Sequence, residues 1–169
     1  CPCGYYNHPT KECQCPPGAV RKYLNRISGP LLDRIDLQVE IQPVPFEAIA
    51  SAEDGEPSAK IRERVVKARR IQQERFKNEP GIHCNARMNS RLLKIHAPLS
   101  DECLEILRQA MEKFDMSARA YDRILKVART IADLDDSAEI RPVHIREAIS
   151  YRNPDRSSWG ASSAAPLPF

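Results

Sequence analysis

The first fifteen residues, CPCGYYNHPTKECQC, hold four of the six cysteines in the chain. They form two Cys-x-Cys pairs, Cys1 with Cys3 and Cys13 with Cys15. Zinc in structural sites binds thiolates and takes four tetrahedral ligands, so this number of cysteines fits one zinc ion. Gly4, Asn7 and Pro9 favour a loop that folds back between the pairs, and His8 offers a substitute ligand.

Two other interpretations of these cysteines stay open. One residue separates the members of each pair, whereas two or more usually separate paired zinc ligands. Disulfides or redox-active thiols are one alternative, and cysteines that only pack are the other. These residues contain no secretory signal, and in a reducing cytosol paired thiols bind metal more often than they form disulfides, which favours zinc. We expect Cys84, which stands alone, and Cys103, on an apolar helix face, to pack.

Arginines are the other candidates for chemistry, because a planar guanidinium binds phosphate oxygens through several donors. Arg34 lies in the string SGPLLDRIDL. Arg119, Arg123 and Lys126 share one side of a predicted helix, and we call them the cationic face. The ordinary alternative is solubility, since surface ion pairs with neighbouring acids contribute under about 1 kcal/mol each.

The composition is that of a soluble, mainly helical protein. Of 169 residues, 41% are apolar, 29% are charged and only 6 are glycine. This length fits one ordinary domain, or a compact domain with an appendage. A net charge of +3 is too small to indicate nucleic-acid binding by bulk electrostatics. No apolar run approaches the roughly 20 residues that a bilayer requires, so we expect a cytoplasmic protein without a membrane segment.

Two elements are predicted before residue 44. Apolar residues spaced i, i+3, i+4 and i+7 from Val20 to Ile27 predict an amphipathic helix that ends at residues 28–30. Alternating apolar and polar residues over 35–41 predict a β-strand with one buried face. One strand needs partners, and the chain begins at Cys1 rather than at methionine. We therefore expect a piece of a longer protein, whose other strands lie upstream.

Helical patterns dominate the rest of the chain. A charged, mostly solvated helix is predicted from Ser58, as its cap, to about residue 77, and a short one over 90–96. Ser100 and Ser117 are predicted to cap longer helices, and Pro142 fits the first position of the last one. The predicted buried stripes of these three helices are Cys103, Leu107, Ala110, Met111 and Phe114; Tyr121, Ile124, Leu125, Ala128, Ile131 and Ala132; and Ile145, Ala148 and Ile149.

At these residues the chain resembles the magnesium-chelatase-like AAA+ ATPases of the ComM/YifB type. The strings CPCGYY, SGPLLDRIDL, SARAYDRILKVARTIADL and RPVHIREAISYR carry the resemblance, over residues 1 to about 156. It implies a mainly α fragment, in which residues 1–44 are the last helix and strand of an α/β P-loop core with a Cys-rich loop. Residues 45–156 are then a helical C-terminal lid, and 157–169 a flexible tail. No Gly-x4-Gly-Lys-Ser/Thr phosphate loop occurs in these residues, so we expect the fragment alone to be inactive.

The resemblance also implies roles for single residues. Arg34, in the family's LLDR stretch, corresponds to an arginine finger that reaches the γ-phosphate held by a neighbouring subunit. Arg119, at the head of the main lid helix, is similar to a sensor-two residue that contacts the nucleotide of its own subunit. Arg123 is a second candidate for that surface. Paired cysteines occur at this place in the family, which favours zinc as a stabiliser of an insertion.

The resemblance implies a full-length protein that uses ATP and Mg to remodel DNA or translocate on it. Its partners are the upstream ATPase core and further copies of itself in a ring, expected to be a hexamer. The alternative is a non-enzymatic zinc-bearing helical module, which binds nucleic acid or a partner protein through the cationic face and the helix from Ser58. The cysteine loop can also present Tyr5, Tyr6 and Lys11 to a single strand.

Overall fold

The computed structural model describes residues 1–6, 8, 10–39, 41, 44, 46–51 and 55–152, and these form two compact units. The first, the cysteine unit, contains Cys1–Ile35. The second, the helical unit, contains Asp36–Glu40 and Val44–Asn153. The predicted tail over 157–169 and the predicted helix breaker Asn153-Pro154 lie outside the described residues.

The cysteine unit carries two short helices, α1 (Pro17–Leu24) and α2 (Gly29–Leu32). Helix α1 is shorter than predicted, because a tight turn follows it. In this turn the Ile27 N–H donates to the Leu24 carbonyl at 3.4 Å. Val20 is the buried residue of α1, at 6% exposure, while Ile27 is 38% exposed. The prediction that this helix continues to residue 28 is therefore wrong: the apolar spacing is present, but α1 ends at Leu24.

The segment with the strand pattern does not form a strand in the described residues of 35–41. The Gln38 N–H donates to the Tyr151 carbonyl at 2.8 Å, beyond the end of a helix. Leu37, Val39 and Ile41 are 51%, 67% and 87% exposed. A β-ladder needs a second strand, and none is present in the part of the chain that the structure describes. The expectation that partner strands lie upstream stays a prediction.

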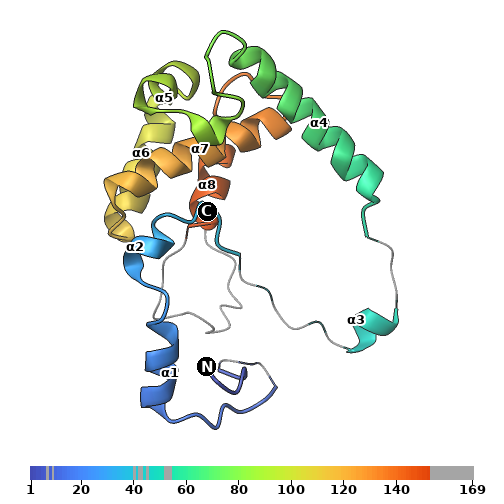
Figure 1. The fold of residues 1–169 in the computed structure, drawn as a ribbon, viewed down its shortest axis with the longest axis vertical. Helices are drawn as coiled ribbons and strands as arrows, with labels where there is room; N and C mark the ends of the chain where they lie inside the picture. The colour runs from blue at the N-terminus through green and yellow to red at the C-terminus, as the bar shows by residue number, and fades with distance from the viewer. Residues whose placement is uncertain are drawn as a thin grey trace. The chain divides into compact units, whose positions relative to one another are not determined.

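The helical unit is an all-α assembly in its described residues (Figure 1). Its elements are α3 (Phe46–Ala50), α4 (Ser58–Arg75), the 3-10 turn η1 (Asn85–Arg87), α5 (Ser90–His96), α6 (Asp101–Lys113), α7 (Ala118–Leu134) and α8 (Pro142–Ser150). The central helix is α7, which contacts α4, η1, α5 and α8, while α6 packs on α8.

Local signals in the sequence explain where most of these helices begin. The Ser100 and Ser117 hydroxyls accept the N–H groups of the third residues of α6 and α7, both at 3.3 Å, which confirms both predicted caps. Pro142 is the first residue of α8, as predicted. Ser58 is not a cap: it is the first residue inside α4, and Pro57 occupies the N-cap position. The cap of α5 is Asn89, which the sequence analysis missed.

The core of the helical unit lies between α5, α6, α7 and α8. Its largest fully buried apolar side chains, at 0–1% exposure, are Leu92, Leu107, Ile124 and Ile145. The predicted stripes are confirmed, with Met111, Phe114, Tyr121 and Ile131 half-buried at their margins. Cys103 packs as predicted, fully buried with its thiol donating to the Ile140 carbonyl at 3.5 Å.

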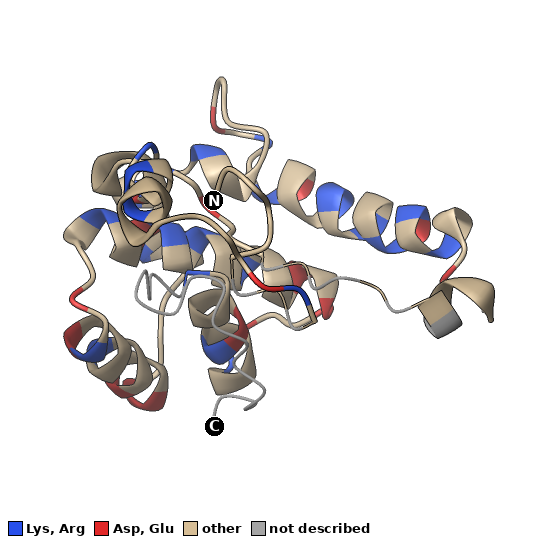
Figure 2. Cartoon of the chain, turned by 90° about the horizontal axis from the view of Figure 1, so that it is seen from below, with Lys and Arg blue, Asp and Glu red and all other residues tan. Residues whose placement is uncertain are grey.

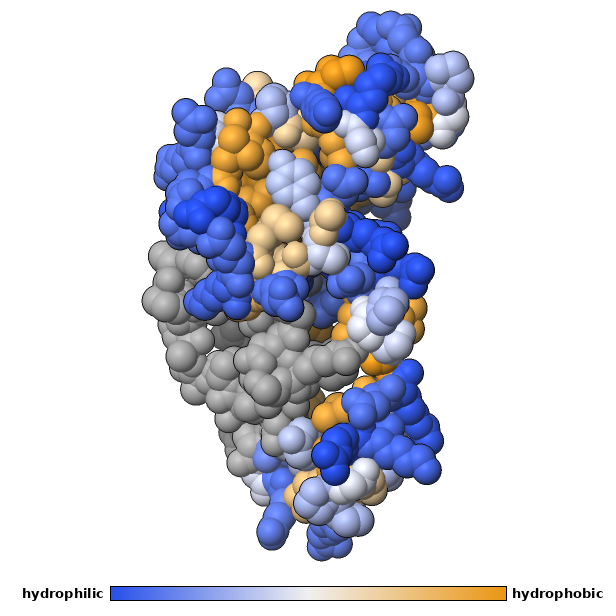
Figure 3. All heavy atoms as spheres, turned by 90° about the vertical axis from the view of Figure 1, so that its left-hand side faces the viewer, coloured by the Kyte–Doolittle hydropathy of each residue, from blue (hydrophilic) through white to orange (hydrophobic). Residues whose placement is uncertain are grey.

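Polar and charged side chains cover most of the outside of this unit. Figure 2 shows Lys and Arg along the length of α4, which agrees with the prediction of a mostly solvated helix. Apolar atoms reach the surface on the side that faces the viewer in Figure 3, bordered by hydrophilic ones. None of the helices in the described residues is long and apolar enough to span a bilayer.

Candidate functional site

The four N-terminal cysteines converge in the cysteine unit. One ligand atom from each, its Sγ, lies within 4.8 Å of the other three. The Cys1 and Cys3 sulfurs are 3.3 Å apart, and each lies 3.6 Å from the Cys13 sulfur. Tetrahedral zinc with Zn–S bonds of about 2.3 Å places its sulfurs about 3.8 Å apart. The four cysteines are free thiols in this structure, and the donor set fits zinc.

The backbone of the first six residues builds half of this cluster. Gly4 has φ +81°, a conformation that favours glycine, and its N–H donates to the Cys1 carbonyl at 3.0 Å. The Tyr6 N–H donates to the Cys1 sulfur at 3.1 Å, and such donors stabilise a thiolate. His8 is not among the residues whose ligand atoms cluster here, and its Nδ1 accepts the Lys11 N–H at 3.1 Å. Asn7 and Pro9 lie outside the described residues.

At Cys3 the surroundings favour the thiolate form that binds metal. The pKa of Cys3 is lowered to about 7, chiefly by a hydrogen bond from the Tyr5 backbone, against the opposing effect of burial. Hydrogen bonds from the thiols of Cys15 and Cys13 lower it further. A hydrogen bond from the Cys15 backbone lowers the pKa of Cys13, but burial and the thiols of Cys3 and Cys15 outweigh it, so the pKa of Cys13 is raised.

Arg34 lies in the cysteine unit, directly after α2. Its side chain is exposed, and its Nη1 donates to the Pro30 carbonyl at 3.1 Å. Asp36, one of its acidic neighbours, forms an ion pair with Arg123 instead. The guanidinium of Arg34 is thus at the surface, with donors still available to a further group.

The cationic face of α7 divides into residues with different surroundings. Arg123 is half-buried and donates to the Asp36 carboxylate, and the Lys126 ammonium donates to the Ala86 carbonyl at 3.2 Å. Arg119 is exposed, and no ion pair engages it among the described residues. Among the three cations of this face, the Arg119 side chain is therefore the most available to a ligand.

A buried polar cluster that was not predicted from the sequence surrounds Asp133, which is 1% exposed. Its carboxylate accepts from Arg75 Nη1 at 2.7 Å, from Asn85 Nδ2 at 2.8 Å and from Arg129 Nε at 3.1 Å. Burial lowers the pKa of Arg129, although Asp133 opposes this effect. The cluster joins α4, η1 and α7. The available signal was the i,i+4 spacing of Arg129 and Asp133 beside the apolar stripe.

Comparisons with known proteins agree with this architecture. A family described as "Magnesium chelatase, subunit ChlI C-terminal" matches residues 55–152, and one described as "Magnesium chelatase, subunit ChlI" matches residues 1–49. The helical unit is the C-terminal lid domain of a magnesium-chelatase-like AAA+ protein.

Comparison with individual relatives identifies the branch of this family to which the chain belongs. It is 43% identical to the competence protein ComM of Haemophilus influenzae over 137 residues, covering 80% of this chain and 26% of that protein. It is 42% identical to YifB of Escherichia coli and 40% identical to YifB of Salmonella typhimurium, each over 159 residues, or 92% of this chain and 29% of the relative. The chain therefore belongs to the ComM/YifB-type magnesium-chelatase-like family, and it spans under a third of the length of these relatives.

Proposed function

We propose that this chain is the C-terminal part of a ring-forming ATPase that couples ATP hydrolysis to remodelling of DNA or translocation on it. The observation that carries the proposal is the match of two consecutive segments, residues 1–49 and 55–152, to the two parts of the magnesium chelatase subunit in order. Residues 1–44 then end the α/β core, and 45–156 are the lid. We propose a cytoplasmic homo-oligomer, expected to be a hexamer, with ATP and Mg bound by the upstream core.

The roles of the arginines follow from the chemistry of phosphoryl transfer. The transferred group spreads negative charge over three oxygens, which a fixed guanidinium stabilises in the transition state. Arg34, exposed after α2, is the proposed finger for the nucleotide of a neighbouring subunit. Arg119 is the proposed sensor-two residue, and its exposed side chain supports this role. Arg123 is the weaker candidate, because it already pairs with Asp36.

Zinc at the four cysteines would have a structural role in this protein. Cys1, Cys3, Cys13 and Cys15 supply a closed set of four sulfur ligands with no residue of another type, as in zinc sites that stabilise a fold. The ion would hold the loop that leads into α1. The non-enzymatic module is less well supported, because two members of its cationic face, Arg123 and Lys126, are engaged within the chain.

Replacing Arg34 in the full-length protein tests the finger. We expect Arg34→Ala to reduce ATP turnover by about 10³-fold or more, since in trans fingers contribute about 10³ to 10⁵ to kcat in other enzymes. Nucleotide binding, measured with a fluorescent ATP analogue, should persist. Arg62→Ala, which removes an exposed arginine from α4, is the matched control. Unchanged turnover in Arg34→Ala would remove the assignment.

A mixing experiment tests whether Arg34 acts across a subunit boundary. Arg34→Ala subunits keep an intact phosphate loop, and subunits with a mutated phosphate-loop lysine keep Arg34. If the finger acts in trans, mixed rings contain sites that combine an intact loop with an intact finger, and part of the turnover returns. Mixtures that stay as inactive as both parents would contradict the trans assignment.

A further inference from the structure

The charge of this chain is concentrated in one unit. The whole chain has 26 basic and 23 acidic residues, a net charge of +3. Residues 1–35 contain five basic residues and two acidic ones, which is also a net +3, so the remainder is balanced. The basic residues are Lys11, Arg21, Lys22, Arg26 and Arg34. The net charge of the whole chain does not show this uneven distribution. A local basic surface is typical of proteins that bind a polyanion.

Aromatic side chains accompany these cations. Three of the five tyrosines of the chain lie in the same unit, and Tyr5, Tyr6 and Tyr23 are 39%, 38% and 43% exposed. The Lys11 ammonium lies 4.9 Å from the centre of the Tyr5 ring, and the Arg26 guanidinium 5.4 Å from that of Tyr23. Exposed aromatic rings next to cations are typical of surfaces that bind single-stranded nucleic acid.

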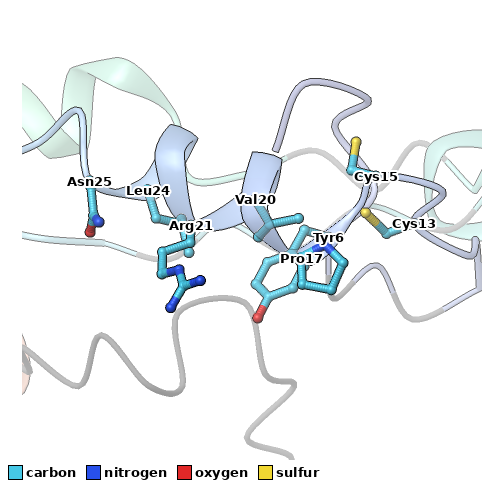
Figure 4. Close-up of a pocket in the computed structure, with 8 residues that line it drawn as sticks. All are labelled: Tyr6, Cys13, Cys15, Pro17, Val20, Arg21, Leu24 and Asn25. Atoms are coloured by element: carbon cyan, nitrogen blue, oxygen red, sulfur yellow. The ribbon is translucent and has the colours of Figure 1, made fainter.

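A groove of about 690 Å³ lies between the cysteine loop and α1 (Figure 4). Pro17, Val20 and Leu24 supply apolar surface along α1, and Cys13 and Cys15 lie at one end. The ring of Tyr6 and the guanidinium of Arg21 project to the same side of the helix in Figure 4. No aspartate or glutamate lines this groove among the described residues, and Arg21 is the basic side chain in its lining, which also contains the thiols of Cys13 and Cys15.

We propose that this groove binds single-stranded nucleic acid, with one base stacked on Tyr6 and a backbone phosphate held by Arg21. The apolar surface of α1 suits the face of a base, because every base has an apolar π-face. The guanidinium supplies donors in a plane, which match phosphate oxygens. The two other tyrosine–cation pairs extend the same chemistry to neighbouring nucleotides. An acidic peptide could use the cations, but it would leave the stacking surface unused.

The cysteine cluster positions this surface. The Tyr6 backbone N–H donates to the Cys1 sulfur, and Cys13 and Cys15 are both cluster members and lining residues. A metal ion that fixes the sulfurs thereby fixes the place of the Tyr6 ring against α1. The inference rests on the DNA part of the proposed function. It requires no ATP hydrolysis, so its failure would leave the ATPase assignment standing.

The test measures binding of a fluorescein-labelled oligothymidine of 20 nucleotides to the zinc-loaded chain. Fluorescence anisotropy reports the binding, and no ATP is present. We expect Tyr6→Ala to raise Kd at least about fivefold, which corresponds to the loss of about 1 kcal/mol of stacking, while Tyr6→Phe keeps the affinity. Arg21→Gln should reduce the slope of log K against log salt by about 0.7, the value for one phosphate contact on a single strand.

Arg146→Gln on α8 removes the same charge outside the groove and should leave the salt slope unchanged. Duplex DNA of the same length should bind more weakly, because its bases are not available for stacking. The proposal is overturned if the chain does not bind the oligonucleotide. It is also overturned if Tyr6→Ala binds like the parent chain, or if Arg146→Gln lowers the slope as much as Arg21→Gln.

Discussion

At the scale of single residues, the carboxylate of Asp133 is a buried charge that depends on its neighbours for stabilisation. It is buried between two arginines, Arg75 at 13% and Arg129 at 4% side-chain exposure. Asn85 adds a further donor. Removing one member of a buried charge cluster is costly, because it leaves the partner charges buried and unpaired.

We therefore expect Asp133→Ala to destabilise the chain by about 3–5 kcal/mol, the usual cost of breaking a buried ion pair. Urea unfolding followed by circular dichroism measures the change. The control is Glu105→Ala, which breaks an ion pair on the surface of α6. Arg108 lowers the pKa of Glu105 to about 2 through a hydrogen bond, but both side chains are well exposed, at 49% and 57%.

Screening by water makes the Glu105 pair weak, so its loss should hardly move the unfolding midpoint. Equal effects of the two substitutions would show that the Asp133 cluster does not stabilise the fold.

The cysteine cluster and the Asp133 cluster show which contacts can be predicted from the sequence and which cannot. The cysteine cluster was predicted because its ligands lie within 15 residues, whereas Arg75 and Asp133 are separated by 58 positions, and no local pattern joins them.

At the scale of elements, prediction succeeded where the signal and the structure are both local. Ser117 caps α7 within its own first turn, and the apolar stripe of α7 follows the period of the helix. The segment over 35–41 has an equally clear alternating pattern, but a strand exists only with a neighbour to pair with. The prediction that Ser58 caps α4 was wrong because the helix begins one residue earlier than expected. Pro57 occupies the N-cap position, and Ser58 is the first residue inside the helix.

The two serines give a matched test of capping. Ser117→Ala removes the hydroxyl that accepts the Ala120 N–H, and we expect it to lower the free energy of unfolding by about 1 kcal/mol. Ser58→Ala should be close to neutral, because Ser58 lies inside α4 and alanine has a high helix propensity. Thermal unfolding of both variants measures the difference. A Ser58→Ala variant less stable than Ser117→Ala would contradict the assigned helix starts.

At the scale of the whole molecule, the two units differ in what stabilises them. Of the 20 buried apolar residues among those described, only Val20 and Leu32 belong to the cysteine unit. A core of this size is too small to hold about 35 residues, and small domains of this kind usually depend on disulfides or a metal ion. In the helical unit, 16 of the other 18 form one cluster around α7, so this unit needs no such support.

Removal of metal should therefore affect the two units differently. We expect the chain to purify with about one zinc ion, as counted by elemental analysis, because its four thiolates form one tetrahedral site. After chelation, amide hydrogens of α1 should exchange at the rate of an unfolded chain, since metal binding free energy is folding free energy in such units. Those of α7 should stay protected. Hydrogen exchange with mass spectrometry measures both, and Cys3→Ser, which removes one ligand, should reproduce the effect without chelator. Equal protection of α1 with and without metal would show that the cysteine unit folds without the ion.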